Sequence, residues 1–440
     1  MKKLLIAICI IAVAISSCKK DNKSVFDKSP DERLKEKLDA YQVQLSGAQD
    51  GWKGLLVTDS GRGSTHSFYF KFNNENRVVM LSDFDSLSAV TLKESSYRLK
   101  ALQQLSLLFD TYSYLHVLAD PDGTVNGGPV GAGLFSDFEF YFDAATSDTI
   151  KLVGRFNGSK MTLVRATKAE ADAYNSGQLA AGLNINKILT YFKRLTIGTQ
   201  LYDVKIDPVN KQFVFSWLDG SGNLQTFTTG YYFIAGGVVF TSPLVNGSQT
   251  ITGFSNIVWN QASETLNLTA DGVASTITGI VVPLKVDTGA PRRWWNYALN
   301  NRNSWGDFFW FSEKGFHVNG VDDAFGIRSL TSGTSIYLFL IYYPEFDPGN
   351  DAFGPLFINA AGTAFQLPFG ATAPVPNFTT DGRVIFQYLG DYGPYPNTGP
   401  AGQSRILLYN TSGYYFVQTG ATTYDMVSAS NGKSWITWEF

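Results

Sequence analysis

Residues 68–81 have the sequence FYFKFNNENRVVML, two apolar runs joined by a short polar stretch. Aromatic and β-branched residues favour strands, and clustered Asn residues between such runs favour a turn, so the stretch predicts a β-hairpin. Similar apolar runs recur along the chain, at residues 55–57, 138–142, 150–153, 213–215, 231–233, 238–240 and 266–268. We therefore predict a mainly β protein with a few helices and an α+β N-terminal part. Its antiparallel sheets are expected to form tandem β-sandwich or barrel-like units.

Three helical segments are expected between the strands. Residues 29–32 form a capping box with proline at the first helical position, and Gly47 is placed to end that helix. Regularly spaced leucines predict a second helix from about Ser96. A further capping box at residues 167–170 begins a connecting helical segment over 168–195.

Composition shifts divide the chain into segments. The helical segment near 168–195 and the Pro and Gly residues of 283–293 mark two boundaries. The predicted segments are a signal peptide (1–17), a lipidated tether (18–28), an N-terminal α+β domain (29–167), a middle β domain with an entry helix (168–286) and a C-terminal β domain (287–440).

Two stretches of the sequence resemble each other, which suggests a repeated architecture. Residues 135–152 and 254–268 share a spacing of aromatic and alternating residues, and the hairpins at 68–81 and 213–227 precede them in the same order. A degenerate tandem duplication and a shared strand composition both explain this similarity.

The first residues resemble an export and lipidation signal. Lys2 and Lys3 precede an apolar run over 4–15, which is shorter than a membrane-spanning helix. Residues 15–18, Ile-Ser-Ser-Cys, resemble a bacterial lipobox. Cleavage before Cys18 and acylation of its thiol would anchor the mature protein to a membrane through lipid.

Several short motifs carry a family resemblance. They lie at residues 26–34 (FDKSPDERL), 94–100 (ESSYRLK), 109–112 (FDTY), 118–122 (LADPD), 125–128 (VNGG) and 154–158 (GRFNG). With them, residues 26–165 resemble a family of Bacteroidota surface lipoproteins of unknown function. Members of this family are usually encoded near starch-utilisation-type uptake systems and a zinc-hydrolase lipoprotein. The resemblance implies an outer-membrane, lipid-anchored accessory protein of nutrient uptake.

Residues 19–22, Lys-Lys-Asp-Asn, partly resemble the signal that sends such lipoproteins to the outer face of the outer membrane. We therefore expect display at the cell surface. The periplasmic face of the membrane is the alternative.

Composition excludes several classes of protein. Charged residues make up only 17% of the chain and the net charge is −3, without a basic stripe. A mostly disordered chain and a nucleic-acid partner are therefore disfavoured. The two cysteines lie within the first eighteen residues, the three histidines are far apart, and neither His-Glu-x-x-His nor Gly-x-Ser-x-Gly occurs. Zinc and serine-hydrolase chemistry therefore lack their motifs.

One loop is a candidate calcium site. Asp120, Asp122 and Asn126 supply the hard oxygen ligands that Ca²⁺ prefers, although the loop lacks the distal glutamate of an EF-hand. The alternative is a Pro-Asp-Gly turn, in which Pro121 presets its φ and Gly123 supplies a positive φ. No other cofactor is predicted.

Four tryptophans are candidate ligand-stacking residues, namely Trp294, Trp295, Trp305 and Trp310. Flat rings stack on the apolar faces of sugars while neighbouring polar groups bind hydroxyls. The alternative is that these rings fill strands and the core.

The sequence favours a non-enzymatic surface lipoprotein that binds a glycan or peptide for an outer-membrane uptake complex. One alternative is an extracellular, glycosidase-like hydrolase that uses paired carboxylates, for which Glu139, Glu313 and Glu345 are candidates. Another is a structural or adhesive surface protein.

Overall fold

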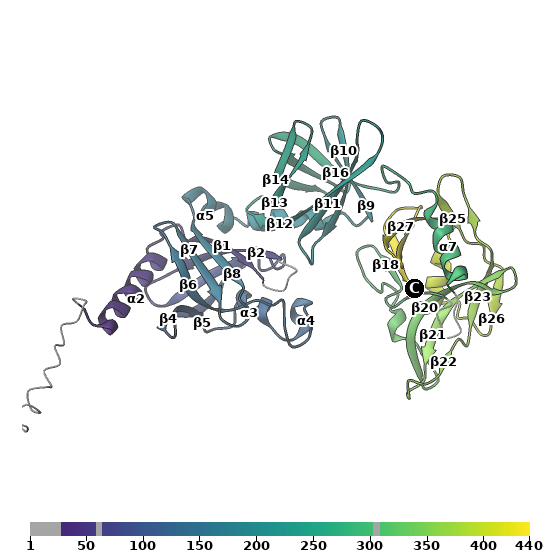
Figure 1. Ribbon diagram of the computed structural model, residues 1–440, viewed down its shortest axis with the longest axis horizontal. Coiled ribbons are helices and arrows are strands. Elements are labelled where there is room, and N and C mark those ends of the chain that lie inside the picture. Colours follow the sequence, from purple (N-terminus) through teal and green to yellow (C-terminus); the bar gives the residue numbers. More distant parts are fainter. Residues whose placement is uncertain (1–27, 59–63, 302–308) are drawn as a thin grey trace, which may run out of the picture. The chain divides into compact units, whose positions relative to one another are not determined.

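The computed structural model describes residues 28–58, 64–301 and 309–440. It confirms the predicted class, since the chain is mainly β, its strands pair antiparallel and a few helices accompany them (Figure 1). By its internal contacts the chain divides into two compact units. The first unit takes in described residues 28–54, 70–80 and 93–166, and the second takes in the described residues of 55–69, 81–92 and 167–440.

Two closed eight-stranded barrels follow one another along the chain. The strands of the first are β1 (Trp52–Val57), β2 (Thr65–Phe72), β3 (Arg77–Ser82), β4 (Lys93–Ala101), β5 (Leu105–Phe109), β6 (Glu139–Ala145), β7 (Thr149–Gly154) and β8 (Lys160–Arg165). Those of the second are β9 (Phe192–Ile197), β10 (Gln200–Asp207), β11 (Gln212–Leu218), β12 (Leu224–Ile234), β13 (Gly237–Asn246), β14 (Gln249–Asn260), β15 (Thr265–Ala270) and β16 (Val273–Ile280). An eight-stranded barrel has an interior that side chains can fill.

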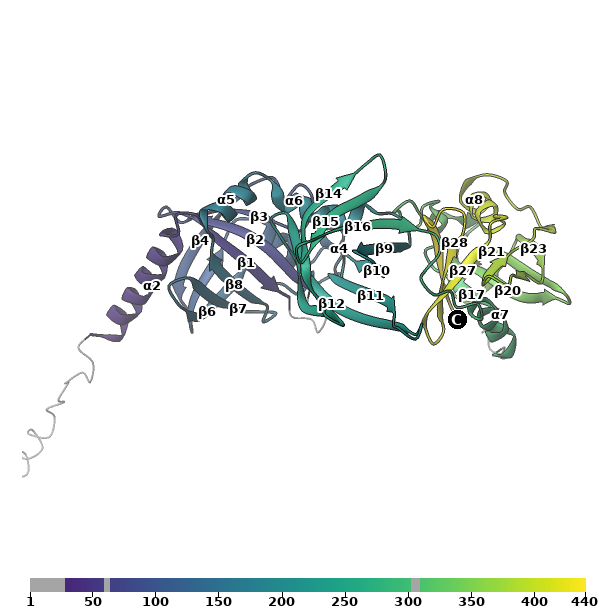
Figure 2. The ribbon, with the colours of Figure 1, turned by 90° about the horizontal axis from the view of Figure 1, so that it is seen from above.

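Burial alternates along the strands of the second barrel, so each strand turns one face toward the barrel interior. In β11, Phe213 and Phe215 are buried while their neighbours are more exposed. Their rings contact Phe240 with centroids 5.3 and 5.4 Å away, and Phe254 joins the same cluster. These inward-facing rings help to fill the interior of the second barrel. Figure 2 shows the strands of this barrel from a second direction.

The remaining strands form a thirteen-stranded sheet near the C-terminus. They are β17 (Trp310–Ser312), β18 (Phe316–Val318), β19 (Thr331–Ser332), β20 (Ser335–Asp347), β21 (Asn350–Ile358), β22 (Phe365–Gln366), β23 (Gly370–Pro374), β24 (Asn377–Phe378), β25 (Arg383–Ile385), β26 (Gly390–Tyr392), β27 (Tyr414–Gly420), β28 (Thr423–Ser428) and β29 (Ser434–Glu439).

Short helices accompany the strands. They are α2 (Pro30–Ser46), α3 (Tyr114–Ala119), α4 (Gly123–Asn126), α5 (Lys168–Asn175), α6 (Gln178–Leu183), η1 (Asn184–Lys187), α7 (Ala290–Asn300), η2 (Ile327–Ser329) and α8 (Gly399–Leu408). The capping box of α2 is confirmed, because the Ser29 hydroxyl accepts from the Glu32 amide and the Glu32 carboxylate accepts from the Ser29 amide. In the described ranges no helix combines the length and apolar character that crossing a bilayer requires.

Two helix predictions need correction. The helix expected from about Ser96 is wrong, because β4 and β5 occupy that region and bury Ser95 and Tyr97 at alternate positions. The connecting helix over 168–195 is right only in its first part, where α5, α6 and η1 lie. Its last residues belong to β9, in which Phe192 and Leu195 are buried.

The two barrels have the same number and order of strands. One of the two sequence similarities matches equivalent strands of the two barrels, and the other does not. Residues 135–152 end in β6 and β7, and residues 254–268 lie in β14 and β15, eight strands later in each case. The hairpins at 68–81 and 213–227 do not correspond, because the first is β2–β3 and the second is β11–β12.

The C-terminal core corrects the prediction of exposed tryptophan rings. Trp294 and Trp310 are fully buried and Trp295 is 6% exposed. The Trp294 ring lies 5.8 Å from that of Trp310 and 5.0 Å from that of Tyr342, centroid to centroid. Stacking on a ligand is therefore wrong for these three tryptophans, because they form the core between α7 and the sheet. Trp305 lies outside the described residues.

Candidate functional site

The hairpin between β14 and β15 builds one wall of a polar pocket. Trp259 is the penultimate residue of β14 and its ring is partly exposed. The following turn is held by Asn260, whose side-chain oxygen accepts from the amides of Ala262 and Ser263 at 3.0 and 3.3 Å. Such an Asx turn needs a short side-chain acceptor at its first position, which the sequence supplies here.

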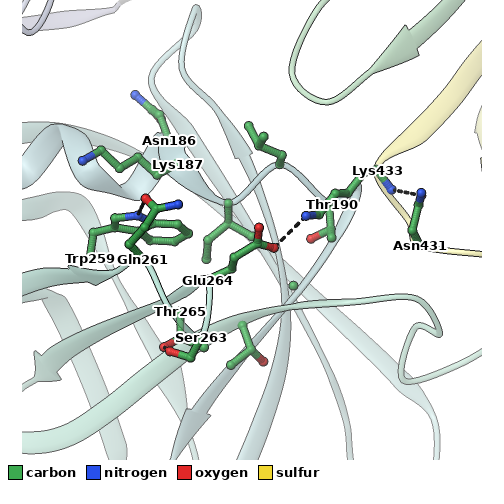
Figure 3. A pocket seen from close by; sticks show the side chains of 14 residues that line it. Asn186, Lys187, Thr190, Trp259, Gln261, Ser263, Glu264, Thr265, Asn431 and Lys433 are labelled. Atoms are coloured by element: carbon green, nitrogen blue, oxygen red, sulfur yellow. Dashed lines mark hydrogen bonds and ion pairs between the residues drawn. The ribbon is translucent and has the colours of Figure 1, made fainter.

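The pocket has a volume of about 670 Å³. We name it the Trp259 pocket, and its lining residues are Asn186, Lys187, Ile188, Leu189, Thr190, Trp259, Gln261, Ser263, Glu264, Thr265, Thr278, Gly279, Asn431 and Lys433. They come from η1 and the segment after it, from β14 to β16, and from the approach to β29 (Figure 3). This volume lies within the usual range for small-molecule sites.

Contacts within the pocket hold its polar groups in place. The Trp259 indole Nε1 donates to Gln261 Oε1 at 2.8 Å. Lys433 Nζ donates to Glu264 Oε2 at 2.6 Å, an ion pair that Figure 3 shows across the pocket. The Glu264 backbone has a φ of 50°, which non-glycine residues seldom adopt, so the turn presents its carboxylate in a constrained geometry.

The chemistry of the pocket suits a ligand rich in hydroxyl groups. A partly exposed indole offers a flat apolar face, while Asn186, Asn431 and the hydroxyls of Ser263 and Thr278 offer donors and acceptors. Glu264 is the only carboxylate among the lining residues, and it is paired with a lysine. The arrangement therefore favours recognition of a sugar over carboxylate-pair catalysis.

A family model for a domain of unknown function, DUF4302, matches residues 22–261. The chain belongs to the DUF4302 family. The matched part spans the first barrel and the second barrel through β14, and it ends at Gln261 in the wall of the Trp259 pocket.

No curated protein matches this DUF4302 chain. Solved structures with partial likeness include the DNA polymerase sliding clamp of Pseudomonas aeruginosa, at 10% identity and a TM-score of 0.15, covering 93% of this chain and 97% of the clamp. A protein of unknown function from the DUF3598 family of Nostoc punctiforme is 13% identical with a TM-score of 0.15, covering 73% and 94%. These low TM-scores carry no argument about fold or function.

The predicted calcium loop of the DUF4302 chain forms a turn and a short helix. Asp122 caps α4 by accepting from the Thr124 amide at 2.9 Å, and Asp120 accepts from the Tyr112 hydroxyl at 2.6 Å. The Asn126 amide group donates to the carbonyls of Val117 and Asp120. All three side chains are therefore already hydrogen-bonded within the chain, which favours the alternative of a turn over a calcium site.

The positive φ expected at Gly123 is instead found at Gly127, where φ is 75° at the end of α4. Cys18, the predicted lipidation site, lies outside the described residues.

A second pocket of about 330 Å³ gathers acidic side chains. We name it the carboxylate pocket, because Glu313, Asp322, Asp323 and Glu439 all line it. His317 also lines it. Its Nδ1 donates to Asp322 Oδ1 at 2.6 Å, and its ring stacks on a tryptophan of β29 with centroids 3.6 Å apart. The His317 contact lowers the pKa of Asp322.

Of the glutamates predicted as catalytic candidates, Glu313 lies in the carboxylate pocket. Glu139 lies in β6 and pairs with Arg155 at 3.7 Å, and Glu345 lies in β20. Sequence spacing did not show that Glu313 would line one pocket with three other carboxylates, because Glu439 is more than a hundred residues away.

A buried polar chain is the feature that sequence reasoning missed. Within the second unit, His66 lies between Ser64 and Asp83, with Ser64 Oγ 3.3 Å from Nε2 and Asp83 Oδ1 3.5 Å from Nδ1. Asp83 Oδ2 accepts from Lys211 Nζ at 2.7 Å. Burial, followed by the Lys211 charge, lowers the pKa of His66.

Ser64, His66 and Asp83 follow one another as in a Ser-His-Asp triad. The charge of Lys211 beside them disfavours the protonated histidine that a triad requires. In such a triad the aspartate stabilises the imidazolium that forms when histidine takes the serine proton. Here Lys211 already neutralises Asp83 and repels a charged His66. The cluster is therefore a structural network, and its only signal in sequence was the two-residue spacing between Ser64, just before β2, and His66 in β2.

Proposed function

We propose that this protein is a lipid-anchored surface protein that binds glycan in the Trp259 pocket as an accessory of an outer-membrane nutrient-uptake system. The observation that carries the binding proposal is the partly exposed Trp259 ring beside a rim of amide and hydroxyl groups. The lipobox-like Cys18, its polar tether and the resemblance to Bacteroidota surface lipoproteins support the location and the uptake role.

Two contacts make Trp259 suitable for stacking. Its indole Nε1 is bound to Gln261, so the ring edge is fixed and the ring does not need to be ordered when a sugar arrives. The Lys433–Glu264 ion pair supplies one acceptor and one donor group in the same pocket. A sugar ring on the indole would therefore have hydrogen-bonding partners for its equatorial hydroxyls.

The test is a glycan panel with Trp259→Ala and a matched control. Trp217 is also partly exposed and lies on β11 of the same barrel, and its ring packs 5.9 Å from that of Tyr202. Binding of panel oligosaccharides is measured by calorimetry and by affinity electrophoresis. We expect Trp259→Ala to weaken binding about tenfold through the lost ring face, and Trp217→Ala to leave it unchanged.

Two results would overturn the proposal. One is that the wild-type protein binds none of the oligosaccharides in the panel. The other is equal loss of affinity in the Trp259 and Trp217 variants, because that would indicate general destabilisation of the barrel.

A hydrolase acting at the carboxylate pocket is the second candidate function. It is favoured by the four carboxylates that line this pocket, since glycosidases need one carboxyl group as acid and a second as nucleophile or base. Incubation of the same panel with wild-type protein, Glu313→Gln and Glu439→Gln, followed by reducing-end analysis, separates the two functions. Product formation that either variant abolishes would establish the hydrolase, and unchanged glycans would support binding alone.

A further inference from the structure

A third cavity combines lysines with an apolar wall. It has a volume of about 320 Å³ and is lined by parts of β9, β10, β11 and β27 and by the segment after β16. Lys193, Lys205 and Lys285 all line it, and we name it the lysine pocket. This cavity shares no lining residue with the Trp259 pocket or the carboxylate pocket.

The apolar wall comes from neighbouring strands. Val204 on β10, Val214 on β11 and Tyr415 and Val417 on β27 line the cavity. Val204 and Tyr415 are already buried, so the apolar surface that a ligand could cover comes from half-buried Val214 and Val417 and from Leu224, a lining residue on β12 that is 43% exposed. A ligand in this cavity would therefore remove apolar surface from water.

The three lysine charges have no acidic partner within the described part of the chain. Lys193 Nζ donates to the Thr190 carbonyl at 2.6 Å, and Lys285 Nζ donates to the Gly222 carbonyl at 3.3 Å. Lys205 Nζ lies 5.8 Å from the centre of the Tyr191 ring. These are neutral partners, so the lysine charges are not cancelled.

The two carboxylates that line the lysine pocket are already neutralised. Asp203 Oδ1 accepts from Arg194 Nε at 2.6 Å, and its other oxygen accepts from the Leu284 amide. Asp287 is paired with Arg293, the shortest distance being 2.6 Å. The pocket therefore carries excess positive charge beside an apolar surface.

The lowered pKa of Lys193 agrees with an excess of positive charge in the lysine pocket. Burial, and next the charge of Lys205, lower the pKa of Lys193 to about 8. Two ammonium groups thus repel each other in a partly desolvated place. An anion between them would relieve the repulsion and would gain charge-assisted hydrogen bonds.

We propose that the lysine pocket binds a small organic anion with an apolar body, its carboxylate between Lys193 and Lys205 and its body on Val214, Leu224 and Val417. Both halves of the ligand follow from the cavity. The unpaired cations select the anionic head, and the apolar wall selects the body. This site is separate from the proposed glycan site and does not depend on it.

Three probes separate charge from apolar contact. Sodium octanoate carries both features, 1-octanol has the same body without charge, and sodium acetate has the charge with almost no body. Binding to the purified full chain is measured by isothermal titration calorimetry. We expect octanoate to bind at least about tenfold more tightly than either control, because each control lacks one of the two contributions.

The variants locate the head group. Lys205 is exposed, so Lys205→Met leaves the fold intact and should weaken octanoate about tenfold while leaving 1-octanol unchanged. Lys193→Met should also weaken octanoate binding and leave 1-octanol binding unchanged. Lys160→Met removes an exposed lysine from β8 and is the matched control, and Trp259→Ala should also leave octanoate binding unchanged.

Three outcomes would overturn the proposal. The first is no binding of octanoate at millimolar concentration. The second is equal affinity for octanoate and 1-octanol. The third is an unchanged octanoate affinity in Lys205→Met, even if Lys193→Met fails to fold.

Discussion

Replacing Lys211 with methionine should destabilise the second unit strongly and in a pH-dependent way. Lys211 Nζ lies 2.7 Å from Asp83 Oδ2, and the two side chains are 6% and 0% exposed. Methionine keeps most of the volume but leaves the Asp83 carboxylate buried without its cation. Breaking a buried pair by removing one partner costs about 3–5 kcal/mol of unfolding free energy, and we expect a loss in this range at pH 8.

The pH dependence follows from His66, the other neighbour of Asp83. In the wild type, burial and Lys211 hold the His66 pKa below its unfolded value of about 6.5. The folded state then binds fewer protons than the unfolded state, so wild-type stability should fall as pH drops through about 6.5.

Without Lys211 the sign of this effect should reverse. Removal of the Lys211 charge and exposure of His66 to an unpaired Asp83 raise the His66 pKa in the folded variant. In the wild type, burial opposes the ionised form of Asp83, but its contacts with Lys211 and His66 outweigh that effect and lower its pKa. In the variant the contact with Lys211 is gone, so a protonated His66 is the neighbour that can still stabilise the Asp83 carboxylate. The imidazolium can then replace the lost ammonium at pH 5.5, and this stabilisation is lost as pH rises through the raised pKa. The loss of unfolding free energy caused by Lys211→Met should therefore be smaller at pH 5.5 than at pH 8.

The assay is urea denaturation followed by tryptophan fluorescence at both pH values. Because the chain has more than one compact unit, the transition that shifts in the variant is fitted separately. Lys168→Met is the matched control, since it breaks a Lys168–Asp172 pair whose side chains are 77% and 64% exposed. That control should change stability by less than about 0.5 kcal/mol. A loss below about 1 kcal/mol in Lys211→Met, or the same loss at both pH values, would refute the reasoning.

Three further predictions concern the anchor, the acidic loop and the core. Cys18→Ser should release the protein from the membrane fraction of the producing cells, since it removes the acylated thiol, and unchanged fractionation with membranes would contradict lipidation. A chelator should leave the melting temperature unchanged, because Asp120 and Asp122 already bind local donors, and a clear decrease would instead establish a calcium site. Trp294→Ala should cost about 3–5 kcal/mol by opening a cavity in the C-terminal core, and a mild effect in denaturation would show that the ring is not packed as described.

Local patterns were sufficient where neighbouring residues decide the structure. The capping box at Ser29 and Glu32 specifies where α2 begins, because both of its hydrogen bonds join residues three apart. The hairpin at 68–81 likewise follows from two strand-forming runs around an Asn-rich turn.

The same patterns failed where spacing was ambiguous. Leu99 and Leu108 fit a helical period, yet they lie on the paired strands β4 and β5, where Leu99 is opposite Leu107 and Leu108 is opposite Arg98. Short apolar runs satisfy both periods, and only strand pairing in the barrel selects between them.

The sequence by itself determined a mainly β chain, the start of its first helix and a candidate lipid anchor, because hydrophobic period, turn chemistry and short motifs are local properties. Only the tertiary structure decided that Trp294 and Trp310 face a core while Trp259 lines a pocket, since burial depends on which strands meet. It also brought Lys211 to Asp83 across 128 positions of sequence and placed Lys193 beside Lys205 without an acidic partner in the described ranges. Electrostatic partners are chosen by distance in space, which sequence spacing does not contain.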